Sequence, residues 1–169
     1  MELVPAVRHF AALVDPPVSA PEQLRALEDA ARGRGIELSI HRAATPEEIV
    51  PAIDMAQASG AQALNVLATP LFNNNQRLIV ERTAALQPPA IYQWPEIAEA
   101  GGLTGYGPRL TECERQRARQ LAKIFRGAKP ADIPVEQPDK FELVNLRTAK
   151  AIGLRVPPAL LDLADKGIE

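Results

Sequence analysis

Few side chains in this sequence combine the residue type and the spacing that catalysis requires. The two histidines, His9 and His41, lie far apart in the chain, and none of the patterns HExxH, GxSxG and CxxC occurs. Neither Gly33-Arg34-Gly35 nor Gly105-Tyr106-Gly107 continues into a dinucleotide-binding or P-loop fingerprint. The sequence therefore nominates no catalytic residue, and we expect a protein that is not an enzyme and uses no cofactor.

Cys113 is the single cysteine of the chain. Alone it forms neither an internal disulfide nor a zinc site, so the sequence predicts no metal centre. A cysteine in a helical stretch with arginines nearby is more typical of a small packing residue than of a reactive thiol.

Asp15 directly follows the first apolar run, where some doubly wound proteins carry a phosphate-accepting carboxylate. Such a site needs further carboxylates nearby, and Asp29 and Asp54 fall on predicted helices instead. Capping of the next helix is therefore favoured over acid–base chemistry for Asp15. An enzyme of the doubly wound class remains as a third hypothesis that no motif supports.

The clearest candidate site is a group of residues in the loops that follow the predicted strands. The aromatic residues Phe72, Tyr92 and Trp94 occur there although aromatic residues make up only 4% of the chain. Flat amphipathic rings suit closure on a small organic ligand, and the carboxyl ends of parallel strands share one edge of a sheet. Packing of Phe72 and Trp94 beneath their own loops is an equally good interpretation.

Short apolar runs and helical stretches alternate along the first two thirds of the chain. The predicted strands cover Phe10–Val14, Ile36–Ile40, Ala63–Ala68, Pro89–Tyr92 and Leu103–Tyr106. Helices between consecutive strands imply right-handed crossovers, so the pattern predicts an α/β protein, a three-layer sandwich with a parallel sheet of order 2-1-3-4-5.

The pattern changes after Tyr106. Arg109 to Arg126 reads as a long helix with a mixed face, followed by prolines every fourth residue at Pro130, Pro134 and Pro138. Phe141 to Leu146 reads as one more strand that does not obviously complete the first sheet. We therefore expect an α/β lobe over residues 1–107, folding as a closed unit, and a less regular segment over residues 108–169.

The charge and hydropathy patterns exclude several classes of protein. With 19 basic and 21 acidic residues the net charge is −2, which removes the electrostatic case for nucleic acid as a partner. No basic start followed by an apolar core opens the chain, and no apolar stretch of about 18 residues occurs in it. As written, the chain is expected to be cytoplasmic.

Several stretches of the second half resemble one known family. They are Pro89–Tyr92, Glu99–Leu103, Tyr106–Pro108, Gly127–Pro138, Lys140–Leu143, Asn145-Leu146 and Thr148–Lys150. These stretches are similar to the substrate-binding proteins of ABC transporters, in the group that includes tryptophan-binding members with a type I periplasmic-binding-protein fold. A weaker likeness extends back to Val4-Pro5 and Leu13–Pro16, so effectively the whole chain is covered.

The resemblance implies the second lobe of a two-lobed protein plus the segment that returns to the first lobe. The initial part of the first lobe has no counterpart here, which would leave half of the ligand cleft. Cleft residues carried over by the resemblance are Asp15, Thr69, Phe72, Tyr92 and Trp94, with Tyr106 at the hinge. The implied ligand is a small molecule such as an amino acid or aromatic acid, bound weakly. An ABC permease is implied as a partner only if a first lobe is supplied, and a periplasmic location only if the chain is a fragment of a longer protein.

The resemblance also raises an alternative function. In the family, the helix Arg109–Arg126 and the strand Phe141–Leu146 pack inside the first lobe, so their apolar side chains would be uncovered here. Self-association would bury these side chains, and the sequence therefore predicts a homo-oligomer. The second hypothesis is a ligand-free structural or interaction module that oligomerises through this segment. The rival arrangement is a segment that folds back on its own sheet.

Overall fold

The structure is a computed structural model that describes residues 4, 7–137, 142–163 and 166–168. One seven-stranded sheet forms its body, in the order β2-β1-β3-β4-β5-β6-β7. The strands are β1 (His9–Val14), β2 (Glu37–Arg42), β3 (Ala63–Val66), β4 (Ala90–Tyr92), β5 (Thr104–Tyr106), β6 (Glu142–Asn145) and β7 (Lys166–Ile168). The helices are α1 (Pro21–Arg32), α2 (Pro46–Ala58), α3 (Pro70–Asn74), α4 (Gln76–Leu86), α5 (Pro95–Glu99), α6 (Leu110–Phe125), α7 (Leu146–Ala151) and α8 (Pro158–Leu163), with a 3-10 turn η1 at Pro130–Asp132.

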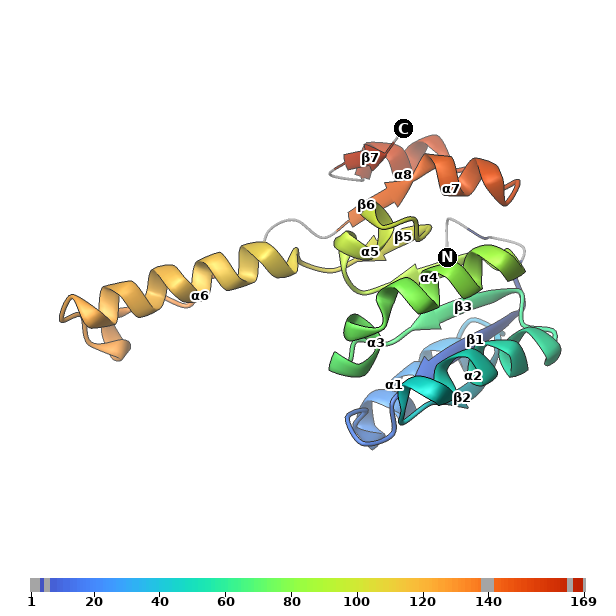
Figure 1. Ribbon diagram of the computed structural model, residues 1–169, viewed down its shortest axis with the longest axis horizontal. Helices are drawn as coiled ribbons and strands as arrows, with labels where there is room; N and C mark the ends of the chain where they lie inside the picture. The colour runs from blue at the N-terminus through green and yellow to red at the C-terminus, as the bar shows by residue number, and fades with distance from the viewer. Residues whose placement is uncertain (1–3, 5–6, 138–141, 164–165, 169) are drawn as a thin grey trace.

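The first five strands are parallel and follow the predicted order 2-1-3-4-5. Figure 1 shows α2 and α4 in front of this part of the sheet and α1 behind it. The α/β class, the layered arrangement and the strand order are thus confirmed. All five strands point toward the same side of the molecule, so their following loops form one edge, named here the strand-end edge.

The sheet continues beyond β5, so the returning segment folds back on its own sheet, as in the rival arrangement. Strand β6 pairs antiparallel with β5, and β7 pairs parallel with β6. Asn145, which is buried, fastens this return: its backbone N–H donates to the carbonyl of Leu103, and its Nδ2 donates to the carbonyl of Ala98, each at 2.8 Å. The expectation that the strand Phe141–Leu146 does not complete the first sheet is therefore wrong where the structure describes it, from residue 142 on.

This return has a physical cause. An uncovered β5 would present a row of unpaired backbone N–H and C=O groups, and a strand of almost any sequence satisfies them. The expected segment 108–169 consequently divides into two parts, one that projects away and one that completes the sheet. Whether residues 1–107 fold as a closed unit stays a prediction.

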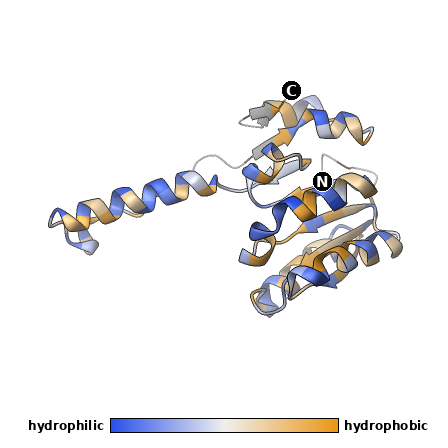
Figure 2. Ribbon diagram, in the orientation of Figure 1, coloured by the Kyte–Doolittle hydropathy of each residue, from blue (hydrophilic) through white to orange (hydrophobic). Residues whose placement is uncertain are grey.

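An apolar core lies between the sheet and the helices α2 and α4. Figure 2 shows the orange, hydrophobic strands at the centre of the body and bluer helix surfaces around them. Its members are Ala11, Leu13, Ala43, Ile49, Ala52, Ile53, Ala56, Leu64, Val66, Phe72, Ile79, Val80, Ala90, Tyr92 and Ile97. Helix α2 stays in place because Ile49, Ala52, Ile53 and Ala56 recur at helical spacing on its buried side.

The helix α6 projects from the body as an arm, with the chain doubling back along it (Figure 1). None of its 16 residues is buried. Its root is held against α5, where Arg109 Nη2 lies 2.7 Å from Glu99 Oε1 and the backbone N–H of Thr111 donates to Glu96 Oε1 at 3.3 Å. The ion pair raises the pKa of Arg109, chiefly through its hydrogen bond to Glu99. We call residues 109–137 the arm.

Candidate functional site

The strand-end edge brings together four of the six residues that the sequence nominated. Asp15 follows β1, Thr69 follows β3, Trp94 follows β4 and Tyr106 ends β5. Because β1, β3 and β4 are consecutive in the sheet at about 4.8 Å spacing, Asp15 and Trp94 lie on strands roughly 10 Å apart. That span suits a molecule the size of an amino acid.

Asp15 has the most distinctive surroundings of the four. The residue is only 4% exposed, and its carboxylate forms no hydrogen bond or ion pair with any described residue. Glu96 Oε2 is the one side-chain oxygen in the described part of the chain that is sealed from solvent without a partner, so the Asp15 oxygens keep contact with water. The expected helix cap is not seen either, because α1 begins after Ala20 without a side-chain cap. Asp15 therefore presents an unused acceptor at the strand-end edge.

Thr69 follows the strand next to that of Asp15, since β3 pairs with β1 and Leu13 lies opposite Val66. Its Oγ1 accepts a hydrogen bond from the backbone N–H of Phe72 at 3.2 Å, which caps the short helix α3. The capping bond uses the hydroxyl as an acceptor, so its proton remains available to donate. Thr69 thus offers a donor next to the Asp15 acceptor.

Phe72 and Tyr92 lie in the core instead of lining the edge. Tyr92 is 2% exposed, and its Oη lies 2.8 Å from Thr83 Oγ1 on α4. Burial raises the pKa of Tyr92 to about 12, and the hydrogen bond to Thr83 opposes this only in part. The packing interpretation, which concerns Phe72 and Trp94, describes Phe72, and Tyr92 is buried as well because Ala90 and Tyr92 share the sheet face that α4 covers. A ligand role for either ring stays an untested prediction.

Trp94 and Tyr106 are the aromatic residues that remain accessible at this edge. Trp94 is half-buried, packs against the core and directly precedes α5. Tyr106 is exposed at the end of β5, where the chain turns into the arm. A stacking surface at the edge is therefore provided by Trp94, and Tyr106 stands at the root of the arm.

A histidine pair that the sequence did not bring together lies elsewhere, on β1 and β2. His9 Nε2 and His41 Nε2 each lie 3.0 Å from Ser39 Oγ, so the two ring nitrogens are at most about 6 Å apart. Burial, and then the charge of His9, lowers the pKa of His41. The two histidines come close because of the strand register, which places His9 opposite Glu37 and His41 opposite Leu13. No cluster of three or more His, Cys, Asp or Glu suited to a metal ion occurs among the residues described.

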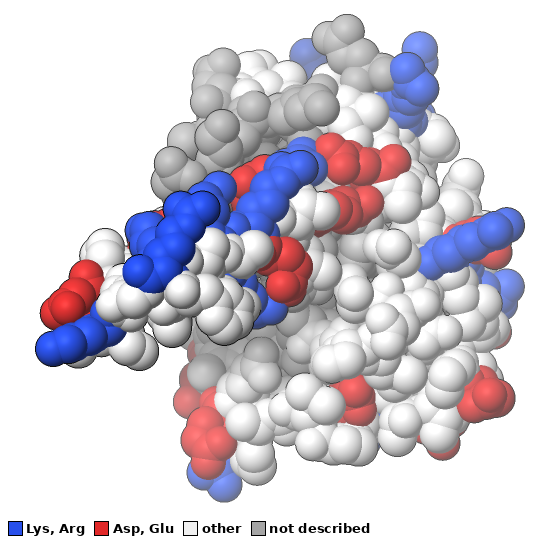
Figure 3. Space-filling model, turned by 60° about the vertical axis from the view of Figure 1, so that its left-hand side comes forward, with Lys and Arg blue, Asp and Glu red and all other residues white. Residues whose placement is uncertain are grey.

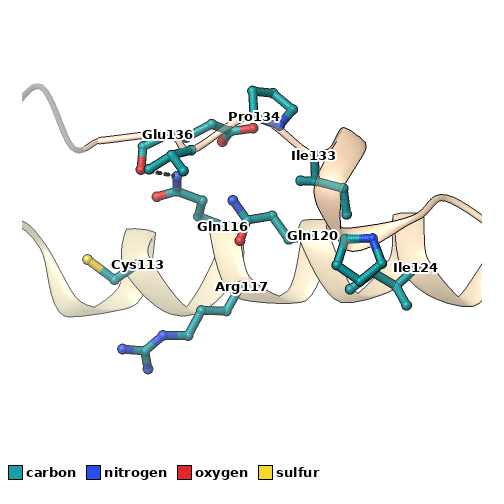
Figure 4. Close-up of a pocket in the computed structure, with 10 residues that line it drawn as sticks. Cys113, Gln116, Arg117, Gln120, Ile124, Ile133, Pro134 and Glu136 are labelled. Atoms are coloured by element: carbon teal, nitrogen blue, oxygen red, sulfur yellow. Dashed lines mark hydrogen bonds between the residues drawn. The ribbon is translucent and has the colours of Figure 1, made fainter.

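The arm contains a groove of about 460 Å³ between α6 and residues 130–136. Figure 4 shows Gln116 and Gln120 directed toward this segment and Arg117 directed away from it. The segment is tied down where Gln116 Nε2 donates to the carbonyl of Glu136 at 3.0 Å. Cys113 lines the groove and has intermediate exposure, as a packing residue would.

These geometries define a class of protein before any comparison is made. A doubly wound α/β body with an open strand-end edge, linked to a projecting segment, has the architecture of one lobe of a periplasmic-binding-protein-like fold. A family model described as ABC transporter substrate binding protein matches residues 1–168. The chain belongs to that family.

Solved structures support the fold. A conserved domain protein from Vibrio cholerae O1 biovar eltor str. N16961 is 19% identical, with a TM-score of 0.83 over 98% of this chain and 56% of that chain. The ABC domain in complex with L-Trp from Streptococcus pneumonia is 20% identical, with a TM-score of 0.79 over 99% of this chain and 58% of that one. A ligand-free, open substrate binding protein with adhesive properties from Clostridium difficile has a TM-score of 0.64 at 20% identity, over 92% of this chain and 53% of that one.

The chain therefore spans little more than half the length of the solved structures it matches. A comparison with curated proteins finds no match. Within the described residues, no helix has the length and apolarity needed to cross a membrane.

Proposed function

We propose that the body binds a small organic solute at the strand-end edge, as the substrate-binding lobe of an ABC import system. The observation that carries this proposal is Asp15, a buried residue whose solvent-reaching carboxylate has no partner among the described residues. Because Asp15 is only 4% exposed, its carboxylate is poorly hydrated, and a bound ammonium group would supply the hydrogen bonds that few waters provide. Family membership supports the same reading.

The chemistry of the edge selects the class of solute. Asp15 would accept hydrogen bonds from an ammonium group, Thr69 would donate to an oxygen of the solute, and Trp94 would stack on a flat or apolar part. These three residues follow β1, β3 and β4, so a single amino acid or aromatic amine spans them. The complex of one similar structure with L-Trp is consistent with this class.

Affinity should be low for the lobe alone. An open edge leaves one side of the solute in water, so we expect a dissociation constant around millimolar, against micromolar or better for an enclosed site. Delivery to a permease would need a second lobe that closes the cleft. The permease and the second lobe are both part of this proposal.

Titration of amino acids and aromatic amines against the fluorescence of Trp94, the single tryptophan, tests the proposal. Asp15→Asn should weaken amine binding by about tenfold or more because the charge-assisted hydrogen bond is lost. Asp29→Asn on α1 is the matched control, since Asp29 pairs only with exposed Arg32 there. Unchanged binding by Asp15→Asn, with Asp29→Asn also unchanged, would refute the role of Asp15. Tight, stoichiometric binding by a monomer would refute the half-open site.

A second candidate function is favoured by the arm. Helix α6 projects from the body without a buried residue and exposes Leu121 and Phe125, which would suit an interaction element. In this alternative the protein is an oligomerising module and the edge binds nothing. A solute panel without any Trp94 response, together with concentration-dependent self-association, would favour this alternative over solute binding.

A further inference from the structure

Two histidines and a serine on neighbouring strands share a single hydroxyl group. His9 is the first residue of β1, and Ser39 and His41 lie on β2, which ends the strand order and has β1 as its neighbour in the sheet. Nε2 of each ring lies 3.0 Å from Ser39 Oγ, and all three side chains are half-buried. We call these three residues the His–Ser–His bridge, because they connect β2 to the start of β1.

The single hydroxyl proton of Ser39 limits how the two rings bond. In the bridged state one ring donates its Nε2–H to Ser39 Oγ, and the hydroxyl donates its proton to the bare Nε2 of the other ring. A proton added to the donor ring goes to its Nδ1 and leaves both hydrogen bonds in place. A proton added to the acceptor ring must go to its Nε2, where it meets the hydroxyl proton. That step breaks the bridge and leaves the hydroxyl the more distant carbonyl of Phe10, 3.5 Å away.

The groups nearest the two rings assign these roles. Glu37 is the one acidic residue of β2, and it lies opposite His9 in the register and four residues before His41. Its exposed carboxylate has no hydrogen bond or ion pair with any described residue. Burial, and then the charge of His9, lowers the pKa of His41. Both observations place the first proton on His9, so His9 is the donor ring and His41 the acceptor ring.

The bridge lies on the sheet face that α2 covers. His9 alternates with Ala11 and Leu13, which belong to the core beneath this helix. Arg42 occupies the alternate position of β2 and so points to the opposite face, and the guanidinium of Arg8 donates to the carbonyl of the preceding residue at 3.4 Å. Strand β3, on the other side of β1, has no titratable side chain. The opposite face is covered by α1 (Figure 1), whose charged residues are Glu22, Arg25, Glu28, Asp29 and Arg32.

Helix α2 presents apolar residues to this face and has three carboxylates. Glu48 Oε2 accepts a hydrogen bond from the backbone N–H of Ala44 at 2.7 Å, Asp54 forms an ion pair with α4, and Glu47 is exposed. On the face of the molecule shown in Figure 3, acidic and basic side chains are interspersed, so that face adds no field of one sign. The protonation of the bridge therefore depends on its own two rings and on Glu37.

We infer that the His–Ser–His bridge is a pH-sensitive switch on the outer strand of the sheet. While His41 is neutral, the Ser39 hydroxyl connects both rings and ties β2 to the start of β1. Protonation of His41 breaks this connection and leaves two positive rings at most about 6 Å apart, so they repel each other. Strand β2 then retains its backbone hydrogen bonds to β1 without this side-chain tie, and we expect it to open more often. The inference does not depend on solute binding at the strand-end edge.

The tautomers of the two rings test the bridge without any substitution. In the full chain at about pH 8, nitrogen NMR shifts should show the ring proton of His9 on Nε2 and that of His41 on Nδ1. As the pH falls, the pair should titrate in two steps, about one pH unit or more apart, with His41 second. Nε2–H on His41 would overturn the inference, because the Ser39 hydroxyl could not then donate to that ring.

Hydrogen exchange tests the effect on the strand. Between about pH 7 and about pH 5 the protection factors of the β2 amides should fall about tenfold relative to those of β4, since one pKa unit corresponds to a tenfold change in the opening equilibrium. Ser39→Ala should reduce the protection of β2 at both pH values, because the bridge is absent throughout. His41→Gln should abolish the pH-dependent fall, because glutamine does not titrate.

Ser19→Ala is the matched control for the serine substitution. Ser19 lies beyond the other end of β1, and its hydroxyl has no hydrogen bond with any described residue, so this variant should behave as wild type. A wild-type ratio of β2 to β4 protection that stays constant with pH would overturn the inference. A fall with pH that is equally large in Ser39→Ala or in His41→Gln would overturn it as well.

Discussion

Removing the Tyr92–Thr83 contact should separate a core role from a ligand role for Tyr92. The Tyr92 hydroxyl donates to Thr83 Oγ1 because the Thr83 hydroxyl itself donates to the carbonyl of Ile79 at 3.0 Å. In Thr83→Val the Tyr92 hydroxyl stays buried without a partner, whereas in Tyr92→Phe no donor is stranded. The two single variants therefore differ in what they leave behind.

The magnitudes follow from this asymmetry. Thr83→Val should lower the free energy of unfolding by about 1–3 kcal/mol, and Tyr92→Phe by about 0.5–1.5 kcal/mol. The double variant Thr83→Val/Tyr92→Phe should be more stable than Thr83→Val alone, because the stranded hydroxyl is gone. Urea unfolding followed by the fluorescence of Trp94 measures all three. A double variant whose loss equals the sum of the single losses would refute the reasoning.

The raised pKa of Tyr92 adds a pH dependence whose sign is fixed. Its folded-state pKa of about 12 lies above the ordinary value of 10.0, so the folded state holds the proton more tightly. The resulting stability is complete below pH 10 and is lost as the pH rises from 10 through 12. Two pKa units correspond to about 3 kcal/mol. Wild type should therefore lose stability between pH 9 and 11 more steeply than Tyr92→Phe, and parallel curves would show that the phenol is not buried in solution.

Two further outcomes are expected. The pKa of His41 is lowered in the folded state, so the stability that its neutral ring contributes is complete above pH 6.5 and is lost as the pH falls through the folded-state pKa. His41→Gln should therefore flatten the fall in urea midpoint between pH 7 and 5. Deleting residues 109–137 should leave the melting temperature of the body nearly unchanged. A chain ending at Gly107 should still melt cooperatively but at a lower temperature, because the carbonyl of Ala98 loses the hydrogen bond from Asn145 Nδ2. An unchanged melting temperature would show that β6 does not stabilise the body.

The sequence predicts the first five strands well because local signals mark each of them. Apolar runs stop at Asp15-Pro16 and at Thr69-Pro70, and prolines begin α1, α2 and α3. The strand-end rule then places Asp15 and Thr69 at one edge without any knowledge of contacts. The addition of β6 leaves no such signal, because it depends on backbone groups of β5 that every residue type possesses.

Side-chain direction is the part of the site that the sequence could not predict. In a sheet covered on both faces, Ile91 and Tyr92 point to opposite faces, and either side chain could pack under a helix. The sequence pattern therefore does not say which face Tyr92 occupies. The structure settles it through the register with β3, where Leu64 lies opposite Ala90 and Asn65 opposite Ile91. The neighbourhood of Ser39 with the two histidines likewise depends on register and not on composition.

The helix of the arm is not stabilised by its own sequence alone. An isolated helix of 16 residues is marginal in water, and exposed ion pairs such as Glu112–Arg115 and Glu114–Arg117 each contribute only about 0.5 kcal/mol or less. The contacts with α5 fix the root of the helix but not its far end, where Phe125 is most exposed. The segment 130–136 adds contacts on the flank of Gln116 and Gln120, and burial of the exposed Leu121 and Phe125 against another surface would add further stability. The body, by contrast, with α2 and α4 packed on its sheet, contains its own core.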